Sequence, residues 1–371
     1  MPHALAYVWE DWESMRNSIG SKSIVRGVAA LVTLGVAGAL TVTTAPAPDA
    51  AAAERAAVDI RVATYNVRSV SLDRTQGEQR PWRERRPGVI ANVTGENLDV
   101  LGVQEVNPSK YYKSRLVTGK NQFQDLRAGL NAAGGSFALT SRYAFNCKKP
   151  STQYRCKTKN RGASHAERIL YNTRTLALVS QGKLKYAKQT GTTSPNYLAW
   201  AVLRTLAGGQ EFLFTTTHLA PKDEGARAAQ WAEMISYINK IKGSRPVVAT
   251  GDFNTHKHKP LAQRFLPAMH QAGYGDTLGQ KPREYELSSP RAESTVNAWM
   301  NTANHLNRDV RAWSFWEKPS KPGNNIDWIF ASNHLPVREY EVVVNYDPNT
   351  WQVNGVIPSD HNMVRATLTL P

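Results

Sequence analysis

Acidic, amide and imidazole side chains recur at the ends of strand-like runs in this sequence. Asn66 ends the run "VATYN", Glu105 follows "VLGVQ", and His218 ends "FLFTTTH". The apolar run "PVVATGDF" reaches Asp252, and Asn254 follows two residues later. Alternate residues of an extended chain point the same way, so this last pair presents its oxygen atoms together. Ligands of α/β proteins gather at the carboxyl edge of the sheet, where we expect these side chains to meet.

Such a group of side chains suits hydrolysis that is assisted by a cation. Hard cations such as Mg²⁺ prefer carboxylate and amide oxygens, and a bound cation polarises the electrophile and activates water. An imidazole exchanges protons near neutral pH. Each residue alone has a more ordinary explanation, because a polar residue at a strand end commonly caps a turn. The argument therefore depends on the whole set and its order.

Two later motifs complete the set, Asp327 in "IDWIF" and Asp360-His361 in "SDH". In this order the residues resemble the endonuclease/exonuclease/phosphatase superfamily, with its deoxyribonuclease I-like fold, over residues 59–371. "GDFN" followed by a terminal "SDH" is the most specific part. The resemblance implies a four-layer α/β sandwich with two packed mixed β-sheets flanked by helices. It also implies an enzyme that hydrolyses phosphoric ester bonds with Mg²⁺ as its cofactor, Mn²⁺ or Ca²⁺ being the alternatives.

The resemblance also implies roles for individual residues. The metal ligands would be Asn66, Glu105 and Asp360. His361 would be the catalytic imidazole, and Asp327 would hold its ring in one tautomer.

The remaining roles concern water and the phosphate. Asp252 would orient or activate the attacking water, and Asn254 would help to fix the phosphate. His218 would donate to a phosphoryl oxygen or to the leaving group. Glu167, in "HAERIL", matches a family glutamate that partners this histidine, and Tyr171 could face the phosphate.

The elements that must position these residues alternate along the chain after about residue 58. Runs rich in Val, Ile, Thr and aromatic residues predict strands, at 59–67, 98–106, 168–172, 212–219, 246–253, 326–330, 338–344 and 363–370. Apolar periodicity and flanking Pro or polar residues predict helices, at 82–96, 121–133, 223–242 and 260–272. The polar stretch 280–325 is expected to hold long loops. Length and pattern favour a single α/β domain over 58–371.

The first residues have a different composition. A basic segment, an apolar stretch from 27 to 42 and the site Ala45-Pro46-Ala47 are typical of a secretory signal region, residues 1–47. Its true start is expected at Met15, an Ala-rich linker follows at 48–57, and a membrane anchor is the alternative. An exported protein with two nearby cysteines, Cys147 and Cys156, is expected to form one disulfide.

Charge bears on the substrate. The formal net charge is +16, which favours a polyanion such as nucleic acid. Basic stretches at 80–87 and 147–161, and a rim formed by His256, Lys257, His258 and Lys259, could follow a phosphate backbone. The aromatic run 312–323 allows three other interpretations, insertion into a lipid surface, stacking on bases or packing in the core.

Three functions are therefore compared. The favoured one is a secreted Mg²⁺-dependent nuclease, acting as a monomer on DNA or RNA. The alternative is a sphingomyelinase or phospholipid phosphodiesterase of the same superfamily, acting at an anionic or choline lipid surface. A binding module without catalysis is the third, and the complete set of carboxylates and imidazoles argues against it.

Overall fold

The computed structural model describes residues 56–108, 117, 121–140, 164–190, 195–279, 291–313 and 323–371. They belong to one compact unit, Glu54–Pro371. The predicted signal region, the predicted disulfide, the basic stretch 147–161 and most of the predicted linker lie outside the described residues. Within the described ranges, the helices are all too short or too polar to cross a membrane.

Two mixed β-sheets form the centre of the described part of the fold. The seven-stranded sheet has the order β10-β12-β15-β1-β2-β4-β3, with β1 (Val58–Asn66), β2 (Val100–Gln104), β3 (Phe137–Leu139), β4 (Arg168–Asn172), β10 (Ser294–Val296), β12 (Val337–Val343) and β15 (Met363–Leu370). The six-stranded sheet has the order β5-β6-β7-β8-β11-β9, with β5 (Leu176–Lys185), β6 (Tyr197–Thr205), β7 (Glu211–His218), β8 (Val247–Asp252), β9 (Tyr274–Asp276) and β11 (Asp327–Ser332). A small hairpin pairs β13 (Tyr346–Asp347) with β14 (Gln352–Val353).

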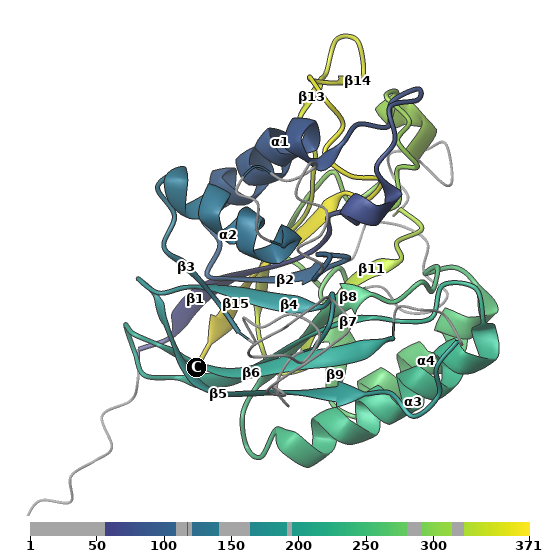
Figure 1. The fold of residues 1–371 in the computed structure, drawn as a ribbon. Helices are drawn as coiled ribbons and strands as arrows, with labels where there is room; N and C mark the ends of the chain where they lie inside the picture. Colours follow the sequence, from purple (N-terminus) through teal and green to yellow (C-terminus); the bar gives the residue numbers. More distant parts are fainter. Residues whose placement is uncertain are drawn as a thin grey trace, which may run out of the picture. The chain divides into compact units, whose positions relative to one another are not determined.

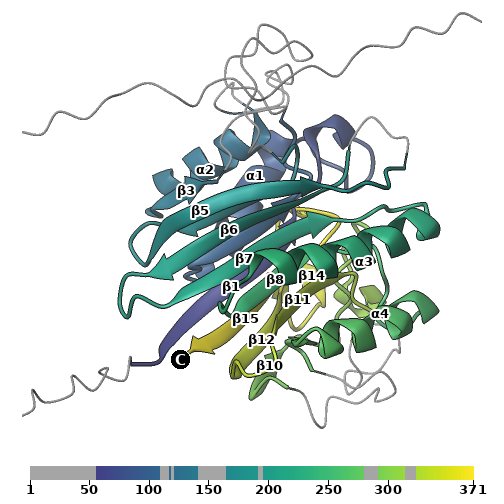
Figure 2. The same cartoon turned by 90° about the horizontal axis from the view of Figure 1, so that it is seen from below.

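Helices cover the outer faces of both sheets. Helices α1 (Trp82–Gly95) and α2 (Gln122–Ala132) lie on the seven-stranded sheet, and α3 (Glu224–Ile241) and α4 (Pro260–Gln271) lie on the six-stranded sheet (Figures 1 and 2). The predicted four-layer sandwich is thereby confirmed.

Each interface between layers has its own apolar core. Val62, Phe214 and Ile329 are buried between the two sheets. Trp82 is buried under the first helix pair, and Trp231 under the second. Strands β2 and β8 are buried along their whole length because a layer covers each of their faces. This explains why both read as continuous apolar runs in the sequence.

Local chemistry sets the helix ends. The Asn121 side chain accepts a hydrogen bond from Gln124 N at 3.0 Å and caps α2. The Asp223 carboxylate caps α3 by accepting from Ala226 N at 2.8 Å. Helix α4 begins with Pro260, whose missing N–H costs nothing in the first turn. The predicted helices match the observed ones within two residues at each end.

The sequence prediction missed the hairpin of β5 and β6. Strand β5 lies at the edge of its sheet and Leu176 is its one buried residue, so its apolar pattern is weak. In the stretch 280–325, the described residues include strand β10 and a 3₁₀ turn, Val310–Trp313. Trp313 is buried, and its Nε1 donates to Asn307 O at 3.1 Å, so this residue packs in the core.

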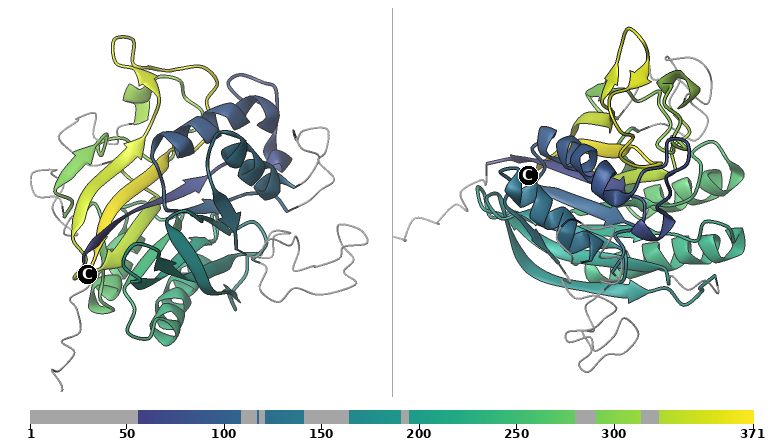
Figure 3. Two further views of the ribbon diagram at one scale, coloured as in Figure 1. Left: turned by 90° about the vertical axis from the view of Figure 1, so that its left-hand side faces the viewer. Right: turned by 45° about the horizontal axis from the view of Figure 1, so that its top comes forward.

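The first and last strands are neighbours in the middle of the larger sheet. Strands β1 and β15 run antiparallel, and Val58 pairs with Leu370. The C-terminus therefore lies beside the start of β1, as both views of Figure 3 show.

Candidate active site

Strand register brings the predicted residues to one edge of the two sheets. Asn66 lies opposite Gln104 at the ends of the parallel strands β1 and β2. His218 lies opposite Asp252 at the ends of the parallel strands β7 and β8. Strand β11 runs antiparallel to β8 and places Asp327 opposite the same aspartate.

Asp252 joins the two sheets. Its Oδ2 accepts a hydrogen bond from Asn66 Nδ2 at 3.1 Å, and the same amide donates to Glu105 Oε1 at 3.2 Å. The Nε2 atoms of His218 and His361 lie 3.3 and 3.8 Å from this Oδ2. Two imidazoles and an amide thus meet around the buried Asp252 carboxylate, and the amide links it to the Glu105 carboxylate.

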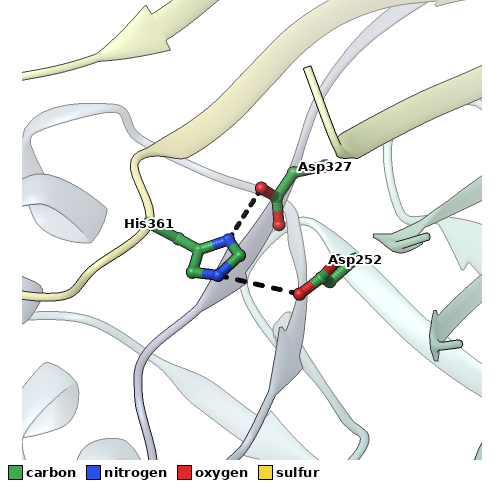
Figure 4. Close-up of side chains that lie close together, drawn as sticks. All are labelled: Asp252, Asp327 and His361. Atoms are coloured by element: carbon green, nitrogen blue, oxygen red, sulfur yellow. Dashed lines mark hydrogen bonds and ion pairs between the residues drawn. The ribbon is translucent and has the colours of Figure 1, made fainter. Parts of the chain in front are cut away.

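His361 and Asp327 form a buried pair. His361 Nδ1 lies 2.9 Å from Asp327 Oδ2, and the opposite ring nitrogen faces Asp252 (Figure 4). Burial lowers the pKa of His361, but the charges of Asp327, Asp252 and Asp360 outweigh burial and raise this pKa well above its usual value. We therefore assign an imidazolium–carboxylate pair, in which the aspartate orients the ring and stabilises its charge.

Glu105 leaves the sheet in an unusual backbone conformation. Its φ is +61°, in the left-handed region that non-glycine residues seldom adopt. The turn directs the carboxylate toward Asn66, and Glu105 Oε2 accepts from Ser69 N at 2.9 Å. Backbone strain at this position is consistent with a functional constraint on where the carboxylate lies.

Asp360 binds an arginine that the sequence reasoning did not select. Its carboxylate forms an ion pair with the Arg68 guanidinium, and it also accepts from Ser359 Oγ at 3.3 Å. Burial raises the pKa of Asp360, but the charges of His361 and Arg68 outweigh burial and lower it. The proposed metal role of Asp360 stays a prediction, and this carboxylate already has a cationic partner.

Three further residues differ in how they relate to the site. Asn254 N donates to Asp252 Oδ1 at 2.9 Å, but its side-chain Nδ2 donates to Leu219 O at 3.0 Å. Glu167 is buried near Glu105, and burial raises its pKa well above the usual value. Among the described residues, no direct hydrogen bond joins Glu167 to His218. The His218 ring instead has Asp252 as its partner.

The suggestion that Tyr171 faces the phosphate is wrong. Strands β4 and β2 are antiparallel, so Arg168 lies opposite Val103 and Tyr171 lies opposite Val100. Tyr171 is therefore at the end of β2 remote from Glu105, where it packs against the core between the sheets.

The prediction of a four-residue basic rim after β8 is also partly wrong. His256 and Lys259 are exposed, and His258 is partly buried. Lys257 is buried, because its ammonium group pairs with Asp276 on β9.

Several supporting residues were missed. Arg68 sits two residues after Asn66 and is half of the ion pair with Asp360. Thr302 Oγ1 accepts from Asp327 N at 3.1 Å, and Asn304 Nδ2 donates to Ser359 O at 3.1 Å. These contacts join segments far apart in the sequence, so only the adjacency of Arg68 to "YNV" offered a sequence signal.

The donor set fits a hard divalent cation. Glu105 and Asp252 bring carboxylate oxygens to one place, on either side of the Asn66 amide nitrogen, and carboxylate oxygens are ligands that Mg²⁺ prefers. The Asn66 amide oxygen accepts from Arg68 N at 3.1 Å, so Asn66 would have to turn its amide to act as a ligand. The buried Asp327 Oδ1 has no hydrogen-bond partner, so it is an acceptor left open inside the site. By spacing, Asp252, Asp327 and His361 also form a group that could hold a metal ion, since their ligand atoms lie within 4.8 Å of one another.

Sequence comparison identifies the class of protein. Residues 63–361 match the model of the Endonuclease/Exonuclease/phosphatase family, so the chain belongs to this family. Members of this family hydrolyse phosphoric esters with a divalent metal, which agrees with the donor set described above. A search of curated proteins finds no match.

Solved structures show the same fold. An endonuclease/exonuclease/phosphatase family protein from Bacteroides thetaiotaomicron superposes with a TM-score of 0.61 at 18% identity, covering 86% of this chain and 97% of its own. A mannosyl-6-phosphatase from the same organism gives 0.59 at 18% identity, covering 84% and 100%. D. rerio TDP2, complexed with a single-strand DNA product, gives 0.51 at 15% identity, covering 84% and 98%.

Proposed function

We propose that this protein is a secreted, Mg²⁺-dependent nuclease that hydrolyses phosphodiester bonds of DNA or RNA. The observation that carries the proposal is the meeting of the His361–Asp327 pair with Asp252, beside the Asn66–Glu105 pair. Secretion depends on the signal-like residues 1–47, and the monomeric state is expected because nothing in the sequence requires more than one copy.

Different residues of the site would carry out metal binding, proton acceptance and proton donation. Asn66, Glu105 and Asp360 are the predicted metal ligands, and the ion would polarise the phosphoryl oxygens and lower the pKa of water. Asp252 Oδ2 is the acceptor for a proton of the attacking water. As the water oxygen bonds to phosphorus, the bond to the leaving oxygen breaks, and that oxygen takes a proton from an imidazolium.

Two imidazoles are placed for donation. His218 and His361 both direct Nε2 at the neighbourhood of Asp252 Oδ2. The raised pKa of His361 keeps its ring charged at neutral pH, so this ring can stabilise negative charge on the phosphoryl group. Asp327 acts through His361 and is a positioning residue.

The net charge and one protein of the same fold support nucleic acid as the substrate. The net charge of +16 attracts phosphate polymers. D. rerio TDP2, which shares the fold, has been solved with a single-strand DNA product. A lipid substrate would need the aromatic run 312–323 to enter the lipid surface, but Trp313 of this run is buried, and residues 314–322 lie outside the described residues.

The test measures product release from plasmid DNA, structured RNA, sphingomyelin vesicles and p-nitrophenyl phosphate, each with Mg²⁺ and with a chelator. We expect metal-dependent cleavage of nucleic acid that is lost in His361→Ala. His334→Ala is the matched control, because His334 is exposed in the turn between β11 and β12. Cleavage of vesicles or of the monoester alone would reject the nuclease, and inactivity on every phosphoric ester would revive the binding module.

A further inference from the structure

A group of basic side chains lies beside the active site and is not used by the chemistry above. Arg227 is in the first turn of α3, and His256 and Lys259 belong to the turn between β8 and α4. His305 comes from the turn that follows the β-bridge between Ala303 and His361. We call these four residues the rim cluster.

Hydrogen bonds place the four residues around the catalytic edge. Lys259 N donates to His256 O at 3.0 Å, in the turn that follows Asn254, and the Arg227 guanidinium donates to Ala220 O at 2.7 Å, two residues after His218. The His256 side chain is exposed on one side only, and partial burial of its ring lowers its pKa; the hydrogen bond with Asn324 raises this pKa, and the charges of Lys259, His305 and Arg227 lower it further. The Arg227 guanidinium also interacts with the charge of Asp252. His305 N donates to Asp360 O at 3.2 Å. The rim cluster therefore begins at the catalytic carboxylates and extends away from them.

The loop that carries His256 is held firmly. Lys257 N donates to Asn325 O at 3.0 Å, and the buried Lys257 ammonium group pairs with Asp276. Asn324 Oδ1 accepts from His258 N at 3.1 Å, so its Nδ2 is the donor to His256 Nδ1 at 3.2 Å. With Nδ1 accepting, the neutral ring carries its hydrogen on Nε2, which leaves that N–H as a donor for a ligand.

Two members of the rim cluster have no acidic partner within the described part of the chain, whereas Arg227 interacts with the charges of Glu224, Asp223 and Asp252. Among the described residues, Lys259 and His305 have no ion-pair partner, and both are exposed. Helix α4 starts at the same place without an acidic residue in its first turn and without a side-chain cap, so its dipole adds to the positive potential. An anion bound beside the exposed Lys259 ammonium group and the start of α4 would therefore meet a favourable potential.

We propose that the rim cluster is a second phosphate subsite, which holds the phosphate next to the scissile one on a nucleic acid strand. This rests on the proposed function, because the first phosphate is the one placed at Asp252 and His361. A nucleic acid strand supplies a second phosphate at a fixed chemical spacing, whereas a sugar monophosphate supplies one anion only. The subsite thus favours a polynucleotide over a small phosphoric ester.

Binding tests the subsite without turnover. We would measure the anisotropy of a labelled oligothymidylate in chelator, across salt concentrations, for wild type, Lys259→Ala and His256→Ala/Lys259→Ala. Removing one exposed charge from the phosphate site should raise Kd about two- to fivefold for the single variant. The slope of log K against log salt should fall by about 0.7 for each phosphate that the variant no longer neutralises. Lys240→Ala, which removes the same charge at the exposed far end of α3, should match wild type.

A substrate pair locates the effect at the second phosphate. Trithymidylate has two phosphates, and its analogue with one linkage replaced by methylphosphonate keeps the bases but has one charge. Wild type should have a higher kcat/KM for trithymidylate, and Lys259→Ala should reduce that preference about two- to fivefold. An unchanged preference, or a Kd equal to that of Lys240→Ala, would refute the subsite. If wild type hydrolyses none of these substrates with metal, the proposed function fails, and the binding data still decide on the rim cluster.

Discussion

Replacing Asp327 with asparagine tests the role of the buried imidazolium. The change keeps the shape of the side chain and removes its charge. The 2.9 Å contact between Asp327 Oδ2 and His361 Nδ1 is buried and charge-assisted, a class of hydrogen bond that contributes about 1.5–3 kcal/mol. If the transition state depends on the charged ring, Asp327→Asn should lower kcat by about 10- to 150-fold.

The pH dependence gives the sign of the effect. The charges of Asp327, Asp252 and Asp360 overcome burial and raise the pKa of His361. The ring is therefore fully charged at acidic and neutral pH, and its charge is lost as pH rises through this raised pKa. Without the Asp327 charge the pKa falls, so activity should decline at a lower pH in the variant than in wild type.

The assay is kcat for a phosphodiester that wild type hydrolyses, measured between about pH 5.5 and 9.5, with urea unfolding alongside to show that the variant folds. Asp309→Asn is the control, because Asp309 belongs to an ion pair with Arg311 on the surface. A folded Asp327→Asn protein with kcat within about twofold of wild type and the same alkaline limit would show that the imidazolium is not required.

Three other variants probe the surroundings of the site. Burial lowers the pKa of His165 from 6.5 to about 4. Its contribution to the free energy of unfolding is therefore complete above pH 6.5 and is lost as pH falls toward 4. In urea titrations, His165→Asn should lessen the loss of unfolding free energy between pH 7 and pH 5 by about 2 kcal/mol. Mg²⁺ at about 100 times Kd should raise the Tm of wild type by roughly 5 °C, and Glu105→Gln should abolish this rise, whereas an equal rise would exclude Glu105 as a ligand. Arg68→Gln leaves the Asp360 carboxylate without its cation and should lower the free energy of unfolding by about 1–2 kcal/mol at neutral pH. Because the pKa of Asp360 is lowered in the fold, urea unfolding at a series of pH values should show this loss disappearing as the carboxyl protonates in acid. A loss that is independent of pH would indicate poorer packing instead.

Much of the site was visible in the sequence because strands and chemistry coincide there. Strand β8 is buried on both faces, so its apolar run ends abruptly where Asp252 leaves the core. The "GDFN" and "SDH" motifs then identified the family and, through it, the sandwich of two sheets. The strand register of the six-stranded sheet then places His218 and Asp327 opposite Asp252.

The parts that the sequence concealed depend on tertiary contacts. Lys257 reads as a surface cation, but its burial depends on Asp276, which lies on a strand beyond helix α4. Arg68 pairs with Asp360 across almost the whole chain, and no local pattern predicts such a contact. Edge strand β5 has a weak apolar signal because only one of its residues, Leu176, is buried.

The pairing of the first and last strands decides where a tether can be attached. Val58 and Leu370 are partners, and Asn66 lies at the other end of β1, eight residues or roughly 26 Å along the strand. A support, label or fused protein joined after Leu370 would therefore emerge on the side away from the catalytic edge and leave it accessible to a long polymer. A short linker between the two ends would likewise close the chain into a circle without crossing the site.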